Sequence, residues 1–281
     1  MALDPTSLGF ETEAVSFSYD FKALALYALG IGAKRDELDL LYEGRGPRVF
    51  PTFAVVPAMA AVNLCLARTG GDFATVVHGN QSVRAHAPLP PAGTLTTVAR
   101  LRAIYDLKKF AQAVVTTETR LPDGTLAFET EWTIIYRGAG GFNGPRPPAS
   151  EAPSPPKDRP ADARFEEATL PEQALLYRLS GDLNPLHADP AFAASVGFTQ
   201  GPILHGLCTY GFAARAIVHA LLGGDASKLR RFDAQFRRPV WPGDTLVTEL
   251  WRADGGIVIV RMTAQGRPDP VLTGAWAQID D

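Results

Sequence analysis

Two eight-residue stretches, PLPPAGTL (Pro88–Leu95) and PVWPGDTL (Pro239–Leu246), align without a gap at an offset of 151 residues. The same offset joins two motifs further upstream, because PTF begins at residue 51 and PIL begins at residue 202. An apolar stretch follows each of these motifs and closes with the same Gly-Gly-Asp sequence. Each match is weak alone, but their common order and spacing indicate one structural unit that the chain contains twice.

The pattern within each copy is that of an α+β unit. A short helix and a loop come first, the longer apolar helix follows, and several strands complete the unit. In the second copy, Asp189 and Pro190 mark a further helix start and Gly197 its end. An antiparallel sheet with one apolar face needs a cover, which an apolar helix supplies. We therefore predict a sheet wrapped around one helix in each copy. The expected strands alternate or run apolar between Gly, Pro and Asp residues, and they are 94–105, 110–121, 126–136, 231–241, 244–254, 256–266 and 271–279.

A Pro- and Gly-rich segment divides the chain near its middle. Residues 138–160, GAGGFNGPRPPASEAPSPPKDRP, have almost no apolar periodicity, which is typical of a linker. We expect an N-terminal unit at residues 1–137 and a C-terminal unit at residues 161–281.

Composition narrows the classes of partner for this 281-residue chain. A formal net charge of −3 gives no broad basic field, so we expect neither nucleic acid nor an anionic membrane surface as a partner. The apolar windows 53–67 and 203–222 are too short or too interrupted by polar residues to span a bilayer convincingly.

Two cysteines, Cys65 and Cys208, are too few for a disulfide framework or a structural zinc site. The N-terminal MALDPTSLGF lacks the pattern of a secretory signal, so we expect a cytosolic protein.

Polar residues concentrate in GDLNPLH, residues 181–187. Gly, Asp, Asn and Pro are common turn formers, so this stretch can be read as a turn without chemistry. It can also be read as an active site, because Asp182 and His187 lie five residues apart around a turn that Pro185 fixes, and both could face one water molecule. Asn184 would then hold that water with its side-chain amide.

The run YRLSGDLNPLH (177–187), followed by GFTQGPILHGLCTYG (197–211) and FRRPVWPGDTL (236–246), resembles the MaoC-like (R)-specific 2-enoyl-CoA hydratases of the double-hot-dog, hydratase 2 type. YALGIGA and VHGNQ in the first half resemble the same proteins. The resemblance implies two hot-dog units packed as a pseudo-dimer, and hydration of trans-2-enoyl-CoA to (3R)-hydroxyacyl-CoA. It implies no metal and no redox cofactor, because coenzyme A arrives as part of the acyl-CoA substrate. Two such chains are expected to pair as a homodimer.

The helix that begins near His205 and Gly206 completes the predicted catalytic set of Asp182, Asn184, His187 and Gly206. Its free N–H groups and positive dipole end would face the thioester oxygen, and we select the Gly206 N–H as the enolate contact. His205 at the helix start is predicted to contact the substrate, although such a histidine is often structural. Arg237 and Arg238 are neighbours on an expected strand, so at most one can face a given surface. Either one could bind a coenzyme A phosphate, or both could lie in solvent or in surface ion pairs.

The repeat provides an internal control for this site. At an offset of 150, Gly32 is the counterpart of Asp182 and Glu37 is the counterpart of His187; at 151, Ala54 matches His205. The first copy therefore lacks the acid–base pair. We predict one active site per chain, in the second half, with the first half shaping the acyl pocket.

Three other functions remain open. A dehydratase of a branched or dicarboxylic hydroxyacyl-CoA uses the same chemistry. A hot-dog thioesterase shares the fold, but many such enzymes carry a carboxylate on or beside the central helix, and residues 47–71 and 201–224 contain no Asp or Glu. A non-catalytic acyl-CoA-binding protein would not explain why the Asp182, Asn184 and His187 set is intact in one copy only.

Overall fold

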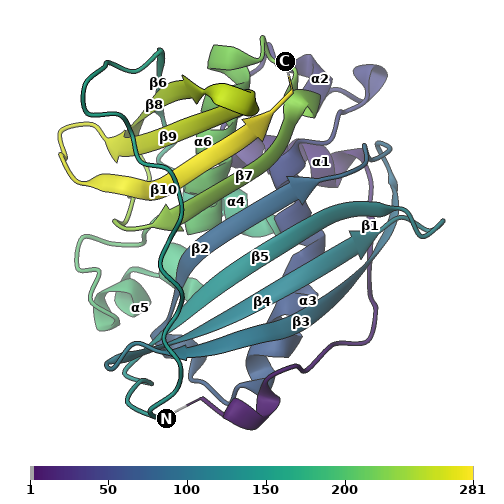
Figure 1. The fold of residues 1–281 in the computed structure, drawn as a ribbon. Coiled ribbons are helices and arrows are strands. Elements are labelled where there is room, and N and C mark those ends of the chain that lie inside the picture. The colour runs from purple at the N-terminus through teal and green to yellow at the C-terminus, as the bar shows by residue number, and fades with distance from the viewer. Residues whose placement is uncertain (1–2, 281) are drawn as a thin grey trace.

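The computed structural model describes residues 3–280 and shows two halves with the same order of elements (Figure 1). The first half contains β1 Val15–Tyr19, α1 Phe21–Gly30, α2 Leu38–Leu41, α3 Val55–Arg68, β2 Val76–Ala85, β3 Gly93–Asp106, β4 Phe110–Arg120 and β5 Leu126–Arg137. The second half contains β6 Ala163–Ala168, α4 Gln173–Tyr177, α5 Pro190–Ser195, α6 Gly206–Leu221, β7 Leu229–Phe236, β8 Thr245–Ala253, β9 Ile257–Ala264 and β10 Pro270–Ile279.

The strands form one antiparallel sheet in the order β1-β3-β4-β5-β2-β7-β10-β9-β8-β6. Each half contributes five neighbouring strands, and the second half repeats the order of the first in reverse. The halves join where β2 pairs with β7, and the pair at this junction includes Ser82 and Asp233, which are 151 residues apart. The sequence offset is thus visible at this one pair, which marks the point about which the antiparallel β2–β7 pairing is symmetric between the two copies. The predicted fold of two hot-dog units in one α+β chain is confirmed.

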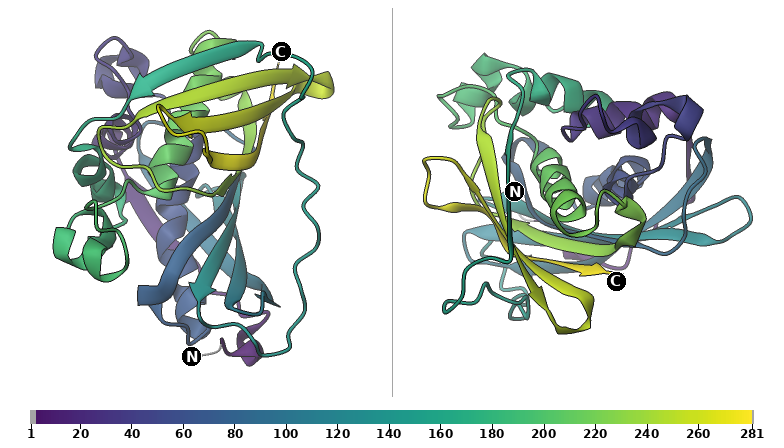
Figure 2. Two further views of the ribbon diagram at one scale, coloured as in Figure 1. Left: turned by 90° about the vertical axis from the view of Figure 1, so that its left-hand side faces the viewer. Right: turned by 90° about the horizontal axis from the view of Figure 1, so that it is seen from above.

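The molecule has three layers, which are the sheet and two layers of helices on one of its faces, and one segment lies on the other face (Figure 2). The central helices α3 and α6 lie side by side against one face of the sheet, and α1 and α4 pack together above them. Gln173 at the start of α4 connects the two outer helices, because its side-chain amide donates to the main-chain oxygens of Leu29 and Gly30 in α1. The outer helix of each half thus packs against the outer helix of the other half.

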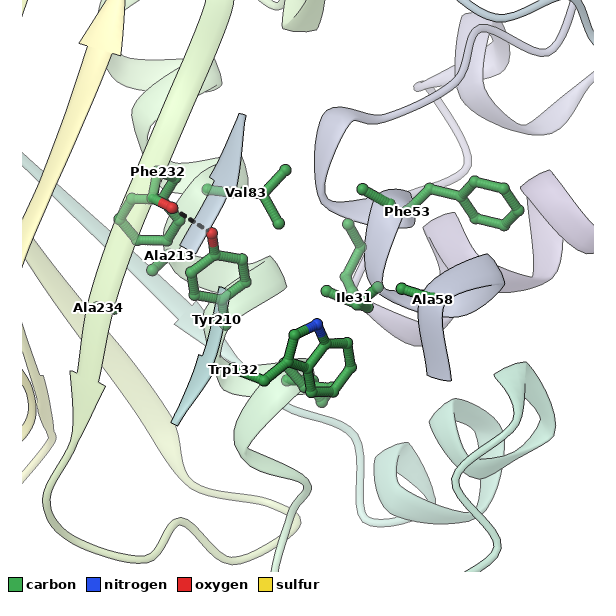
Figure 3. Close-up of a cluster of buried hydrophobic side chains, with 14 of the residues drawn as sticks. Ile31, Phe53, Ala58, Val83, Trp132, Tyr210, Ala213, Phe232 and Ala234 are labelled. Atoms are coloured by element: carbon green, nitrogen blue, oxygen red, sulfur yellow. Dashed lines mark hydrogen bonds between the residues drawn. The ribbon is translucent and has the colours of Figure 1, made fainter. Parts of the chain in front are cut away.

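Both halves contribute to one continuous hydrophobic core. Figure 3 shows Trp132 of β5 and Ile31 of the first half beside Tyr210 and Ala213 of α6. The Tyr210 hydroxyl donates to the main-chain oxygen of Phe232, so this large ring is buried without leaving its polar atom unpaired. A shared core makes the two units a pseudo-dimer rather than two independent domains.

The segment between β5 and β6 contains neither helix nor strand. It runs along the face of the sheet that the helices leave free (Figure 2). Asp106 N–H donates to the Pro145 oxygen, and the Gln235 amide donates to the Ser150 hydroxyl, at 2.8 and 3.4 Å. These contacts fix a long connection over the sheet.

The helix predicted from its capping residues is confirmed. Asp189 accepts hydrogen bonds from the N–H groups of Ala191 and Phe192, α5 begins at Pro190, and Gly197 follows its end at a φ of +102°. Three strands were not predicted from the sequence: the edge strands β1 and β6, and β2 at the junction of the halves. The edge strands are short and precede a helical segment, and a bulge at Gly79 interrupts the pattern of β2.

The apolar stretch that leads into α3, Pro51–Arg68, is long and apolar enough to cross a membrane. Most of it is buried, and α3 packs against β3 and β4. This helix is therefore a core element of the fold.

Candidate active site

Residues 181–187 form a turn, and the same turn carries Asp182 and His187, so the two interpretations of this stretch are compatible. Asp182 Oδ1 accepts a hydrogen bond from Asn184 N–H at 3.2 Å, and Asn184 Oδ1 accepts one from Leu186 N–H at 3.0 Å. Asn184 thereby caps a single 3-10 turn, Pro185–His187. These local bonds compete with regular helix and fix the loop around its proline. The amide nitrogen of Asn184 has no hydrogen-bond partner among residues 3–280, so it can still hold a water.

His187 is fixed as a neutral base. Its Nδ1 lies 2.8 Å from the main-chain oxygen of Ile203. A carbonyl can only accept, so Nδ1 carries the proton and Nε2 presents a lone pair. Burial lowers the pKa of this imidazole, the nearby charge of Arg178 lowers it further, and the Asp182 carboxylate and the Ile203 oxygen partly offset these effects. His187 is therefore neutral at pH 7.

Asp182 and His187 come together as predicted. One side-chain oxygen of Asp182 and one ring nitrogen each of His187 and His205 lie within 4.8 Å of one another. Asp182 is partly buried, and no ion pair to it occurs in the described part of the chain. A carboxylate without a cationic partner, beside an unprotonated imidazole nitrogen, is suited to take a proton from water.

The same three residues satisfy the proximity expected of a metal site, but their geometry suits another purpose. The rings of His187 and His205 stack with centroids 3.7 Å apart and planes at 25°. Lone pairs of stacked rings point side by side, whereas a metal ion must lie close to the plane of each ligating ring. The trio fits a metal poorly, and the absence of a metal cofactor stays a prediction.

His205 lies behind this pair, and its side chain is only 1% exposed. Its Nε2 donates to the main-chain oxygen of Asp182 at 3.1 Å. Its Nδ1 is buried without a hydrogen-bond partner among the described residues. Burial lowers its pKa well below the usual value, and the neighbouring His187 lowers it further. The predicted contact of His205 with substrate does not agree with its buried position. Its Nε2 is already hydrogen-bonded, and its Nδ1 is not accessible.

Gly206 is the first residue of α6, as predicted. The N–H groups of the first helical turn have no partner within the helix, so they are available to an anion at this end. A Cβ built on Gly206 would lie 3.2 Å from the ring of Phe236, so a larger residue would press against β7. Glycine here keeps the helix start close to the strand.

A cavity of about 520 Å³ opens beside His187. Its walls combine prolines and small residues with a few polar groups, a mixture that is typical of a small-molecule site. The lining residues all belong to the second half, and they are Pro171, Ala174, Leu175, His187, Ala188, Gln200, Gly201, Pro202, Trp241, Pro242, Asp244 and Arg267.

Arg237 and Arg238 do not line this cavity. β7 ends at Phe236, so both arginines lie in the following loop rather than on the expected strand. Arg237 Nε donates to the Thr273 hydroxyl at 2.8 Å, and Arg238 pairs with Asp269 at 2.9 Å in solvent. A role for either in coenzyme A binding stays a prediction.

Sequence reasoning missed Arg267 on the cavity wall. This residue donates to the Asp244 carboxylate and lies 5.1 Å from the centre of the Trp241 ring. Both partners belong to the PVWPGDTL motif, so this motif holds the arginine in place. Arg267 lies in a loop whose sequence has no motif that would have indicated a role.

His78 reaches the site from the first half. Its ring stacks on Trp132 at 5.3 Å and contacts Phe236 at 4.9 Å. Burial lowers its pKa to about 4, although the main-chain oxygen of Asn80 and the charge of Asp182 act in the opposite direction. The effect of Asp182 indicates that His78 lies near Asp182 and His187.

The paired hot-dog units, with Asp182 and His187 close together beside the start of α6, define the class of double-hot-dog proteins. Two family models match this chain: MaoC like domain over residues 152–269 and MFE-2 hydratase 2 N-terminal domain over residues 17–138. The chain belongs to the MaoC-like hydratase 2 family.

Individual relatives agree with this assignment. The chain is 43% identical to 3-hydroxyacyl-thioester dehydratase Y of Mycobacterium tuberculosis, over 95% of this chain and 93% of that protein. It is 37% identical to the peroxisomal enoyl-CoA hydratase 2 of Arabidopsis thaliana, over 92% and 89%. The crystal structure of a MaoC-like dehydratase from Phytophthora capsici superimposes with a TM-score of 0.84 at 30% identity, over 97% and 96% of the two chains.

Proposed function

We propose that this protein is a hydro-lyase that hydrates trans-2-enoyl-CoA to (3R)-hydroxyacyl-CoA. The observation that carries the proposal is the convergence of the Asp182 carboxylate and the His187 ring within 4.8 Å, beside a helix start and a cavity. Relatives named enoyl-CoA hydratase support the reaction class, and the hydratase 2 relationship supports the (R) configuration.

The proposed addition assigns one role to each of these groups. The water oxygen bonds to C3 of the enoyl group while Asp182 and His187 Nε2 take one of its protons. The electron pair of the double bond moves toward the thioester oxygen, where the Gly206 N–H stabilises the developing enolate. The proton held by the pair then passes to C2, so the net change is the addition of one water.

The test is a spectrophotometric hydration assay with crotonyl-CoA and longer or branched enoyl-CoAs, followed by chiral analysis of the product. We expect loss of the conjugated thioester absorbance and a (3R) product. Release of free coenzyme A instead would favour a thioesterase, and binding without turnover would favour a non-catalytic acyl-CoA-binding protein.

The pH dependence follows from the state of His187. Because the pKa of this ring lies below 6.5 in the folded enzyme, the neutral base persists as pH falls through 6.5. We expect kcat/KM to hold at pH 6.5 and to decline only at lower pH, as measured with crotonyl-CoA.

Dehydration of a hydroxyacyl thioester is the second candidate, because it is the same reaction in reverse. The relative named 3-hydroxyacyl-thioester dehydratase favours it. Assays from both directions would show which acyl group gives the higher kcat/KM, with branched and dicarboxylic hydroxyacyl-CoA included.

Three properties stay predictions from the sequence: a cytosolic location, a homodimer of double-hot-dog chains, and catalysis without metal or redox cofactor. We also propose a role in fatty acid metabolism, because the proposed substrate is a fatty acyl thioester. Light scattering tests the homodimer. Activity after dialysis against a chelator tests the independence from metal ions.

A further inference from the structure

His205 contacts three parts of the loop that carries the acid–base pair. One face of its ring lies against Tyr177, with centroids 5.0 Å apart, and another stacks on His187. Between these, its Nε2 holds the main-chain oxygen of Asp182 at 3.1 Å. A single side chain at the start of α6 therefore touches the beginning, the middle and the end of residues 177–187.

The surroundings of His205 leave no room for substrate. The ring is 1% exposed and does not line the cavity, whereas the adjacent His187 does. Nε2 must carry the proton because its partner is a carbonyl, so Nδ1 is unprotonated, and Nδ1 is buried. A proton on Nδ1 would meet no acceptor and would bring charge next to a second imidazole. His205 is thus a fixed neutral ring.

The first copy of the repeat lacks the residues that His205 connects. Gly32, Glu37 and Ala54 stand where the second copy has Asp182, His187 and His205, while Tyr27 still matches Tyr177. The three residues that lie together in the second copy are all replaced in the first, although the neighbouring tyrosine is kept. Fold alone therefore does not require a histidine at this helix start.

We propose that His205 is a positioning residue for the reaction: it makes no contact with substrate and sets the separation of the Asp182 carboxylate and the His187 imidazole. It does so through two different contacts, a hydrogen bond to the Asp182 main chain and a ring stack on His187. The inference rests on the proposed hydration for its kinetic test, but its geometric content can be measured without turnover.

Three substitutions separate the two contacts. His205→Phe keeps a ring to stack and removes the donor, His205→Gln keeps a donor and removes the stack, and His205→Leu removes both. A misplacement of about 1 Å can cost on the order of 10²-fold in rate. We expect kcat for crotonyl-CoA to fall by on the order of 10²-fold in the leucine variant and by less in the other two, with KM within about twofold of the wild type. His86→Gln, which changes an exposed histidine bonded to Glu129, is the matched control and should behave as wild type.

A second readout does not need activity. Titration of His187 by NMR reports its surroundings, which include Asp182, Arg178 and His205 as well as Asp244 and Arg267 on the cavity wall. The Asp182 carboxylate raises the pKa of His187, so a changed separation of the two residues in His205→Leu should shift the His187 titration. In the His86→Gln control it should not move.

The outcomes are distinct. A rise in KM at constant kcat in the His205 variants would make this residue a substrate contact, and unchanged kinetics together with an unchanged His187 titration would make it a structural cap; either overturns the proposal. If the wild type hydrates no enoyl-CoA, the proposed function fails, and the NMR titration still decides the positioning role.

Discussion

The loops at residues 31–37 and 181–187 occupy matching places in the two copies, but one is filled with a salt bridge and the other opens on a cavity. Glu37, the counterpart of His187, binds the guanidinium of Arg215 and lies 2.9 Å from His219 Nε2, both on α6. Arg215 also binds Glu167 of β6 at 2.6 Å, and its side chain is 2% exposed. The matching place in the first half has become a buried ionic contact between the halves.

Gly32 shows why no pair of catalytic groups fits there. A Cβ at this position would lie 2.5 Å from the ring of Phe212 and 3.0 Å from Arg215, and its φ of +93° favours glycine. Asp182, its counterpart, lies close to His187, which lines the cavity. We infer that the first copy uses this place for an ionic contact across the interface, and that the second copy uses it for the proposed chemistry.

Breaking the intact copy should have the largest effect. His187→Ala removes the base whose Nδ1 is fixed by Ile203, and we expect kcat/KM for crotonyl-CoA to fall by on the order of 10²–10⁴-fold, with little change in the melting temperature. Glu37→Ala at the matching place in the first copy should retain kcat/KM within about threefold at a temperature where it is folded. A loss of rate equal to that of His187→Ala would place catalysis in both copies.

The ionic contact in the other copy should matter for stability rather than rate. Arg215→Leu leaves Glu37 and Glu167 without their shared cation in a buried place, which costs about 3–5 kcal/mol in the free energy of unfolding. Chemical denaturation measures this, and Arg238→Leu, at an exposed pair, is the control that should cost under about 1 kcal/mol. Equal losses in the two variants would contradict a special role for the buried contact.

The helix start can be tested by filling the space of Gly206. Gly206→Ala brings a methyl group to 3.2 Å from Phe236 and displaces the N–H that stabilises the enolate, so we expect kcat to fall by about 10²–10³-fold. The double variant with Phe236→Ala restores space and should recover part of the rate in the same hydration assay. No recovery would mean that the methyl group acts by another route.

The pH dependence of stability sharpens the comparison further. Burial alone would raise the pKa of Glu37, but the hydrogen bond to His219, the charge of Arg215 and the Lys34 N–H together lower it to about 2, from 4.5. A depressed carboxyl pKa stabilises the fold above pH 4.5, and this contribution is lost as pH falls toward 2. The stability difference between wild type and Glu37→Gln should be on the order of 3 kcal/mol at pH 7 and shrink toward zero near pH 2 in denaturation curves. A difference that stays constant over this range would show that ionisation of Glu37 is not the source.

The repeat explains how much of this fold could be read from the sequence. Matching motifs 151 residues apart predicted two equal units, and the pairing of Ser82 with Asp233 follows the same spacing. Their union into one sheet could not be predicted, because it depends on β2 and β7, whose facing residues lie far apart in the chain. The edge strands β1 and β6 are too short for their sequence pattern alone to identify them.

The site divides in the same way. The turn that carries Asp182, Asn184 and His187 and the helix start at Gly206 were predictable because both are local features, whereas the catalytic roles of these residues stay predictions. The surroundings of His205 and the partners of Arg237 and Arg238 were not, since they depend on groups such as Thr273 and Asp269 in a later hairpin. The repeat showed that Glu37 replaces the histidine of the second copy. Its ion pair could not be predicted, because its partner Arg215 lies 178 residues away in the chain.

The most direct test of the account is the rate of crotonyl-CoA hydration by Asp182→Asn, which preserves the shape of the loop and removes only the charge. We predict that the rate falls by at least about 10²-fold while the protein melts at the wild-type temperature. A folded variant that hydrates crotonyl-CoA at the wild-type rate would show that the second-half carboxylate does not take the proton from water.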